Sequence, residues 1–335
     1  MSNPVLIELT RGSRIESWHR GALAVADADG QPSLAFGDVH GPVFPRSAIK
    51  AIQCLPLIES GAADRYGFGA AEIALACASH SGTERHVAVA GHMLKCACLD
   101  TSALGCGAHE PLGPAAARKL IEARETPTAL HNNCSGKHAG MVATAQHLGE
   151  PIAGYLKPDH PVQLRAVAAL EELTGETISA DRIGIDGCSA PNWAVSLTGL
   201  ARAFARLISG EGLSVQRRDA ARRIMQACWA EPEMVAGPGR LDTELMTRFS
   251  GALFLKTGAE GVYCGAIPGS GLGFALKIDD GAKRASELAV QAAIAHLLPA
   301  ARDLPLSAVL PNWNGLPAAE IRCSTPYRDA LSRLD

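Results

Sequence analysis

Strand patterns occur at both ends of this chain, with helical patterns in between. Apolar segments with alternating or continuous character, bounded by turns such as 27–30, predict antiparallel strands. These segments lie at 5–9, 15–20, 22–26, 34–36, 252–256, 261–267, 273–278 and 319–323. We therefore expect one sheet assembled from the two ends of the chain, with a helical region inserted between them.

The central region is dominated by apolar residues that recur with the period of a helix. The predicted helices, separated by joints that contain Gly or Pro, cover 70–78, 84–99, 115–123, 137–148, 161–173, 193–208, 219–229 and 242–249, and another follows at 283–298. The sequence predicts an α+β fold over 1–335, organised as one two-lobed domain. Residues 1–45 and 251–335 form a sheet lobe in this prediction, and 46–250 form a mainly helical lobe.

Charge and composition restrict the partners. The net charge of −3 gives no electrostatic basis for binding nucleic acid or an anionic membrane, so a small-molecule substrate is favoured. The first twenty residues have no apolar core of a secretory signal, and no stretch has the length of a membrane span. Ten cysteines in such a chain are expected to be reduced. These features predict a cytoplasmic enzyme.

Two short motifs suggest a nucleophilic serine. Ser47 precedes Lys50 by three residues at the start of a predicted helix, and Lys256-Thr257-Gly258 follows far downstream. Penicillin-binding proteins and serine β-lactamases combine the same two motifs, S-x-x-K and K-T-G, in this order. Each motif alone is weak, because a serine that caps a helix and a lysine on the surface would look the same.

The spacing of Ser47 and Lys50 places both on one helix face, where the amine can reach the hydroxyl. Lysine acts as a base only when it is neutral, and nearby cations favour the neutral form. Lys256 and Arg46 are candidates for these cations, and Arg46 could instead bind a substrate carboxylate. The free N–H groups of the helix start would stabilise negative charge at Ser47.

Further polar residues gather in three places. Ser79 lies at the end of an apolar helix, where a capping role is the plain alternative. Cys134 and Lys137 share the same three-residue spacing, and Asp186 and Cys188 flank a glycine at a predicted turn. Two thiols with a nearby amine resemble a zinc site, although the spacing is not a standard zinc signature and two reduced structural thiols remain the alternative.

Together these motifs resemble those of the rhizobial-type L-asparaginases, in the asparaginase II superfamily, over essentially the whole chain. The motifs are Pro-Arg-Ser-Ala-Ile-Lys at 45–50, Ala-Ser-His at 78–80, His-Asn-Asn-Cys-Ser-Gly-Lys-His at 131–138, Asp-Gly-Cys-Ser-Ala-Pro at 186–191 and Lys-Thr-Gly-Ala-Glu-Gly at 256–261. The resemblance implies a serine β-lactamase-like, glutaminase-like fold and a homodimer. The S-D-N element of the β-lactamases is absent, which speaks against β-lactam turnover.

The resemblance also implies roles for particular residues. The family has two Ser-Lys tandems, each a serine paired with a lysine. In this chain they fall on Ser47 with Lys50 and on Ser79 with Lys256. One zinc ion per chain is expected, and its ligands fall on Cys134, Lys137 and Cys188, with Asp186 near the metal-bound water and the substrate. Because these are not the ligands of known catalytic zinc sites, we expect the zinc to position the substrate rather than to generate the nucleophile.

The predicted reaction is hydrolysis of L-asparagine to L-aspartate and ammonia through a serine acyl-enzyme. One alternative is another serine amidohydrolase on the same fold, acting on glutamine or on a peptide amide. A zinc-responsive or redox-responsive binding protein, with structural serines, is an alternative of a different class.

Overall fold

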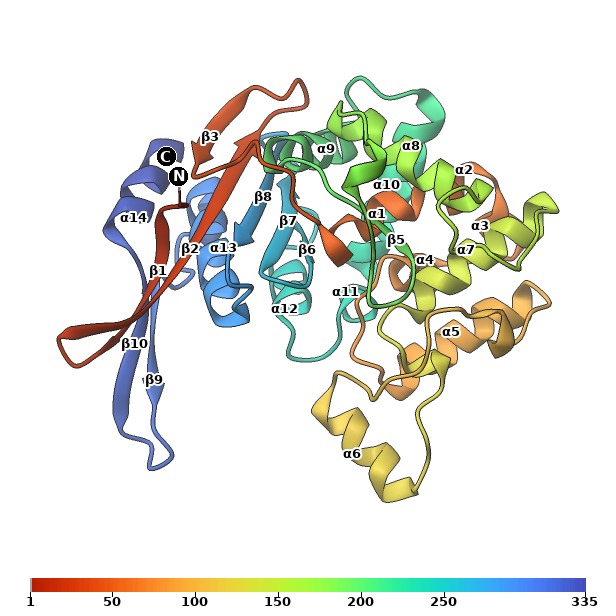
Figure 1. Cartoon of the computed structure of the whole chain (residues 1–335), viewed down its shortest axis with the longest axis horizontal. Helices are drawn as coiled ribbons and strands as arrows, with labels where there is room; N and C mark the ends of the chain where they lie inside the picture. The colour runs from red at the N-terminus through yellow and green to blue at the C-terminus, as the bar shows by residue number, and fades with distance from the viewer. Residues whose placement is uncertain (1) are drawn as a thin grey trace. The chain divides into compact units, whose positions relative to one another are not determined.

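The computed structural model describes residues 2–335, which form two compact units. The first unit consists of 1–48, 195–209 and 252–335, with Met1 outside the described residues, and the second consists of 49–194 and 210–251. The chain therefore passes between the units four times. The two units are shown in Figure 1 with the labels used below.

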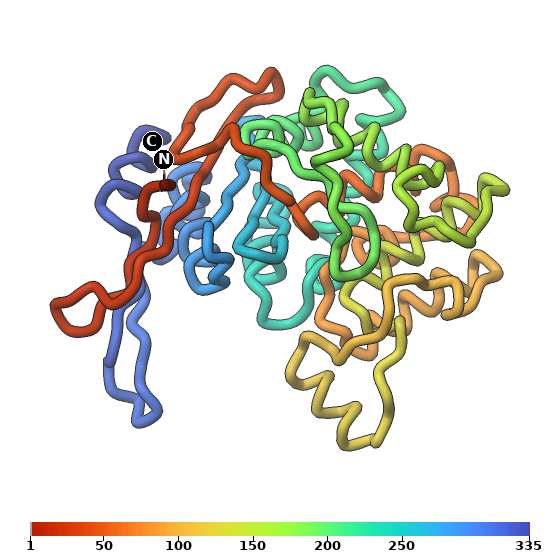
Figure 2. Tube along the Cα trace, in the orientation of Figure 1, coloured from red at the N-terminus to blue at the C-terminus, as the bar shows by residue number. Residues whose placement is uncertain are grey.

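An antiparallel sheet forms the first unit. Its strands are β1 Val5–Arg11, β2 Arg14–Ala26, β3 Pro32–Phe36, β6 Phe254–Thr257, β7 Val262–Ile267, β8 Leu272–Ile278, β9 Ser307–Pro311 and β10 Pro317–Cys323. They pair in the order β6-β7-β8-β2-β1-β10-β9, and β3 pairs with β2. The red N-terminal and blue C-terminal segments of this unit lie side by side in Figure 2. The prediction of one sheet from both ends of an α+β chain is confirmed.

Strand β2 joins the two halves of this sheet. Its residues up to Arg20 pair with β1, and those from Gly21 onwards pair with β8. A Cβ atom at Gly21 would lie 2.2 Å from the carbonyl oxygen of Lys277, so only glycine fits where β2 meets β8. The predicted strands at 15–20 and 22–26 are thus one continuous strand.

Three helices complete the first unit: α9 Leu197–Ser209, α13 Lys283–Leu297 and α14 Thr325–Leu331. Helix α9 packs against β2, β7 and β8, and its Phe204 stacks on Phe254 with ring centroids 6.0 Å apart. Helix α13 packs against β1, β7, β8 and β10. Their apolar faces bury the sheet residues that form the core of this unit.

Helices make up most of the second unit. They are α1 Lys50–Gln53, α2 Leu55–Glu59, α3 Ala62–Arg65, α4 Ala70–Ala76, α5 Glu84–Cys96, α6 Pro114–Ala123, α7 Ser135–Leu148, α8 Pro161–Thr174, α10 Val215–Ala230, α11 Pro232–Val235 and α12 Leu241–Arg248. Strands β4 Ile183–Ile185 and β5 Pro191–Trp193 form a separate hairpin. None of the helices among residues 2–335 is long and apolar enough to cross a membrane.

Helix α7 is the centre of the second unit, with its residues from Ser135 to Ala145 all buried. Small residues on α7 allow α2, α3, α4, α5 and α8 to pack around it. A Cβ atom at Gly136 would lie 2.3 Å from the carbonyl oxygen of Leu75, so α4 approaches the backbone of α7 directly. This close approach brings the residue that follows α4 near the start of α7.

Candidate active site

The start of α7 carries Cys134 as its N-cap residue. The short 3-10 helix Ala129–His131 leads the chain to this point. Asn132 then fixes the turn, because its side-chain oxygen accepts from the Cys134 N–H at 2.9 Å and its amide donates to the carbonyls of Cys106 and Gly107. The Cys134 sulfur is thereby held at the positive end of a buried helix, where a thiolate is favoured.

Lys50 places a buried amine beside this sulfur. The residue begins α1 and is 0% exposed. Its Nζ donates to the carbonyl oxygen of Ala78 at 2.5 Å, to Ser79 Oγ at 3.0 Å and to Cys134 Sγ at 3.0 Å. The Lys50 amine is thus surrounded by three hydrogen-bond acceptors. The hydrogen bond between Lys50 and Ser79 connects the two predicted tandems, because Lys50 belongs to one of them and Ser79 to the other.

Ser79 is held rigidly behind α4. Its N–H donates to the Val235 carbonyl at 2.9 Å, and the next N–H, of His80, donates to the Asn133 carbonyl at 3.1 Å. The side chain is 4% exposed. Sequence patterning predicted the helix to continue to 78, whereas α4 ends at Ala76 and leaves Ser79 in an extended connection that faces Lys50.

The turn between β4 and β5 supplies the second thiol. The sequence predicted a helix start after this turn, but strand β5 follows instead. The N–H of Asp186 donates to the Ala190 carbonyl, and Ser189 adopts a left-handed backbone with φ +68°. Cys188 Sγ consequently points to Lys137 Nζ at 3.1 Å and lies 3.7 Å from Asp186 Oδ2.

The pKa values of the two thiols and of Lys137 are shifted in different directions. A hydrogen bond from the Cys188 thiol, with the charges of Lys50 and Lys137, holds the pKa of Cys134 well below its usual value. The same hydrogen bond, with burial, raises the pKa of Cys188. Burial alone would lower the pKa of Lys137, but the charges of Cys188 and Cys134 raise it. The amines of Lys50 and Lys137 thus favour the charged form of Cys134, and the two cysteines favour the charged form of Lys137.

This cluster has the chemistry of a soft metal site. Thiolate sulfurs favour zinc over harder ions, and Lys137 adds a nitrogen beside the Cys134 and Cys188 sulfurs. Across residues 2–335, no group of three or more His, Cys, Asp or Glu side chains is placed to hold a metal ion. The predicted zinc set differs from such groups because one of its three ligands is a lysine.

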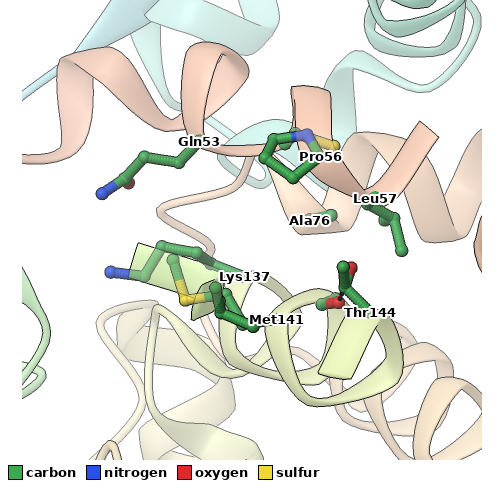
Figure 3. Close-up of a pocket in the computed structure, with 10 residues that line it drawn as sticks. Gln53, Pro56, Leu57, Ala76, Lys137, Met141 and Thr144 are labelled. Atoms are coloured by element: carbon green, nitrogen blue, oxygen red, sulfur yellow. Dashed lines mark hydrogen bonds between the residues drawn. The ribbon is translucent and has the colours of Figure 1, made fainter. Parts of the chain in front are cut away.

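A small cavity lies behind the Lys137 side chain. It is lined by Gln53, Pro56, Leu57, Lys137 and Thr144 among others, and its volume is about 10 Å³. Figure 3 shows the Gln53 amide and the Lys137 amine directed to the same side of this cavity, away from Thr144. A space of this size holds one water molecule at most, so it is not a substrate pocket.

The remaining predicted residues belong to the first unit. Arg46 and Ser47 lie in a 3-10 helix, Arg46–Ile49, where the sequence predicted the start of an α-helix, and both are half-buried. Arg46 has a left-handed backbone with φ +53°. Lys256 lies in β6, fully buried, and its Nζ donates to the Thr257 carbonyl at 2.9 Å.

The segments of Ser47 and Lys256 meet in the fold although they are far apart in the sequence. A Cβ atom at Gly258 would lie 2.5 Å from the Pro45 carbonyl oxygen and 3.3 Å from the Ala48 nitrogen. The end of β6 therefore packs directly on the backbone around Ser47, and only glycine at position 258 permits this. The predicted pairs of Ser47 with Lys50 and of Ser79 with Lys256 each combine residues of different units and stay predictions.

Several supporting residues were quoted in the sequence motifs without a role. His80 Nδ1 accepts from the Gly82 N–H at 3.1 Å, so its Nε2–H donates to Ser135 Oγ at 2.9 Å and ties the Ser79 segment to α7. Asn132 orients Cys134 as described above, and His138 lies one residue after Lys137. The density of polar residues at 131–138 was the sequence signal for this network.

Comparison with known proteins agrees with the motifs. The profile of the L-asparaginase II family matches residues 7–321. The structure resembles a crystal structure of Mglu in its native form, with 17% identity, a TM-score of 0.41 and a match of 81% of this chain to 62% of that one. It also resembles a β-lactamase from Mycobacterium bovis, with 12% identity, a TM-score of 0.35 and a match of 80% of this chain to 89% of that one. The chain thus spans 62% of the length of Mglu.

A search of curated proteins gave no significant match. The family profile, however, extends over nearly the whole chain and includes every motif that contributes to the clusters of the two units. From this coverage it follows that the chain belongs to the L-asparaginase II family.

Proposed function

We propose that this enzyme hydrolyses the side-chain amide of L-asparagine to L-aspartate and ammonia through a serine acyl-enzyme. Membership of the L-asparaginase II family supports the substrate. The observation that carries the chemistry is the fully buried amine of Lys50, hydrogen-bonded to Ser79 Oγ at 3.0 Å. A lysine held against a serine hydroxyl in this way can exchange a proton with it, which supports a proton relay from Ser47 through Lys50 and Ser79.

In the proposed first step, neutral Lys50 takes the proton of Ser47, and Ser47 Oγ attacks the amide carbon of asparagine. The tetrahedral intermediate collapses, the carbon–nitrogen bond breaks, and the amide nitrogen leaves as ammonia with a proton from Lys50. Water then attacks the β-aspartyl ester and gives a proton to neutral Lys50, the ester carbon–oxygen bond breaks, and Lys50 passes this proton to Ser47 Oγ as aspartate leaves. The bond between Lys50 and Ser79 supports a role for Ser79 as a carrier of this proton.

Backbone N–H groups near Ser47 and after Lys256 are the proposed donors to the oxyanion. The packing of Gly258 against the backbone of Pro45 and Ala48 supports this assignment, because both segments are then rigid. One such donor contributes about 2.7–4 kcal/mol to the transition state. Arg46 is proposed to bind the α-carboxylate of the substrate, and Lys256 to assist Ser79 in hydrolysis of the ester.

We also propose that Cys134, Cys188 and Lys137 hold one zinc ion, since Lys137 Nζ lies 3.1 Å from the Cys188 sulfur and the charge of Lys137 acts on Cys134. Lys137 would have to lose its proton to bind the metal. When bound, the metal supplies a positive charge that orients the α-amino and α-carboxylate end of the substrate. Asp186, close to Cys188, would accept a hydrogen bond from the α-amino group. We propose further that the enzyme is a homodimer and that it works in the cytoplasm. Its ten free cysteines fit a reducing compartment.

Ammonia release from asparagine and from glutamine by the purified enzyme tests the proposed substrate. We expect turnover of asparagine, and none after Ser47→Ala. Mass spectrometry of the acid-quenched reaction should then find a β-aspartyl adduct on the peptide that contains Ser47. An adduct on the Ser79 peptide would exchange the roles of the two serines, and turnover of glutamine alone would refute the asparaginase assignment.

A further inference from the structure

Strand β9 ends the sheet of the first unit with an open edge. It pairs with β10 on one side, and no other strand within residues 2–335 pairs with it. Natural proteins usually protect such an edge with charged side chains, prolines or a covering helix. The sequence of β9, Ser-Ala-Val-Leu-Pro, has no charged residue, and only Pro311 at its end is of the protective kind. The edge is therefore open to pairing with another strand.

The backbone of β9 presents hydrogen-bonding groups to this edge. The carbonyl of Leu306, just before β9, accepts from the Cys323 N–H of β10 at 3.0 Å. In an antiparallel ladder, successive residues direct their N–H and C=O groups to opposite sides of the strand. Those of Ser307 and Val309 therefore point away from β10, where an added strand can bond to them.

Large apolar side chains on the same hairpin are exposed. Val309 is 61% exposed, Leu316 is 57% exposed, and Trp313 in the hairpin turn is completely exposed. Leu306 is 38% exposed. Figure 2 shows this blue hairpin projecting from the rest of the first unit. Exposed apolar residues gathered in one place are typical of a surface that binds another protein chain.

A second copy of the chain fits this edge, because an antiparallel strand pair can be formed by two identical strands related by a two-fold axis. With the axis at Val309, each Val309 donates to and accepts from the other, and the Ser307 N–H donates to the Pro311 carbonyl. Pro311 has no N–H that would stay unpaired. This register places the two valine side chains together and Trp313 beside the exposed Pro305 of the second copy. A shifted register would place Val309 opposite Ser307 instead.

We propose that β9 is the dimer interface of this enzyme and pairs with β9 of a second copy, antiparallel and centred on Val309. The proposal rests on the homodimer of the proposed function and identifies its surface. Because β9 has no charged side chain, the two strands approach without like-charge repulsion. Burial of Val309, Trp313 and their neighbours provides the hydrophobic contribution, and the ladder of backbone hydrogen bonds fixes the orientation.

Sedimentation equilibrium of the purified enzyme tests this surface, and we expect a dimer. Val309→Lys should raise the dissociation constant about 10-fold or more, because two like charges then lie opposite each other at the axis. Its circular dichroism should be unchanged. Ile121→Lys, at a 68% exposed position of α6, is the matched control and should leave the dissociation constant unchanged. An equally tight dimer in folded Val309→Lys would overturn the proposal.

Disulfide cross-linking tests the register. Residues of a hydrogen-bonded antiparallel pair have Cα atoms about 5.5 Å apart, which is within the range of a disulfide. In a background where the exposed Cys98 is replaced by serine, Val309→Cys should form a disulfide between two copies on mild oxidation. Leu316→Cys is equally exposed but distant from the axis, and should not. A dimeric Val309→Cys variant that forms no such disulfide would refute the proposed pairing.

These measurements separate failure of the interface from failure of the proposed function. If Val309→Lys does not fold, the cross-link of Val309→Cys decides the question alone. A monomeric unmodified enzyme, including one that binds a strand of another protein at β9, would refute both the interface and the proposed homodimer. Ammonia release from asparagine is measured independently of the oligomeric state, so it decides the proposed reaction in either case.

Discussion

Replacement of Lys50 tests the centre of the proposed site. Lys50→Met removes a buried amine and leaves three acceptors, on Ala78, Ser79 and Cys134, without their donor. Hydrogen bonds to charged groups contribute about 1.5–3 kcal/mol each. Because the freed acceptors can partly reorient, we expect the free energy of unfolding to fall by about 3–5 kcal/mol in total. A loss of this size is typical when one member of a buried charged pair is removed.

A double-mutant cycle with Ser79→Ala isolates the bond between the two residues. Urea unfolding of the four proteins should give a coupling energy of about 1.5 kcal/mol or more. In the ammonia-release assay each single variant should lose about 10²–10⁴-fold in kcat, and the double variant should lose little more, since residues that act as one unit are not additive.

Lys119→Met is the control for this cycle, because Lys119 is an exposed lysine that pairs with an exposed Glu84. Its effect on stability should be within about 0.5 kcal/mol. The reasoning fails if the losses of Lys50→Met and Ser79→Ala simply add, in stability and in kcat. Lys50 and Ser79 would then work independently in spite of their contact.

Three other predictions concern metal, pH and packing. Elemental analysis should find about one zinc per chain in the enzyme and none in a folded variant with Cys134→Ser and Cys188→Ser; zinc retained there would place the site elsewhere. Burial lowers the pKa of His80 well below its usual value, so its contribution to stability is complete above about pH 6.5 and is lost as the pH falls below that, by up to about 1.4 kcal/mol per pH unit. Urea unfolding between pH 7.5 and 5 should show a shallower decline in His80→Gln, and an identical slope would refute this. Gly136→Ala should unfold at much lower urea concentration because α4 blocks its Cβ, whereas Gly91→Ala, with only one distant neighbour, should gain about 0.5–1 kcal/mol.

The sequence was sufficient to predict the architecture because the strand patterns at both ends are long and regular. It failed where local signals were weak. Strand β9 and helix α14 were missed, since β9 is short and its five residues lie at an exposed edge of the sheet. The single helix predicted after Ser47 is a 3-10 helix followed by α1 and α2, because the 3.6-residue period does not reveal breaks between short helices.

The sequence motifs identified the residues of the candidate site, but not all of the residues that contact them. A spacing of three residues predicts that Lys50 serves Ser47. The spacing gives no sign of the hydrogen bonds that Lys50 makes within its own unit, to Ala78, Ser79 and Cys134, which are distant in sequence. Contacts of this kind depend on the close approach of α4 to α7 at Gly136. No periodicity within either helix specifies that approach.

The order in which this chain can fold follows from the way the first unit is assembled. Strand β1 pairs with β10, and Glu8 lies opposite Arg322, more than three hundred positions later. The helices of the second unit pack on one another within 49–194 and 210–251, all of which precedes β8 and β10 in the chain. During synthesis, β1 and β2 must therefore wait for β8 and β10 to leave the ribosome, while the helical unit is already complete. The exposed edges of β1 and β2 during that interval are where chaperone dependence and aggregation should concentrate, and circular permutation that joins the two ends should shorten the wait.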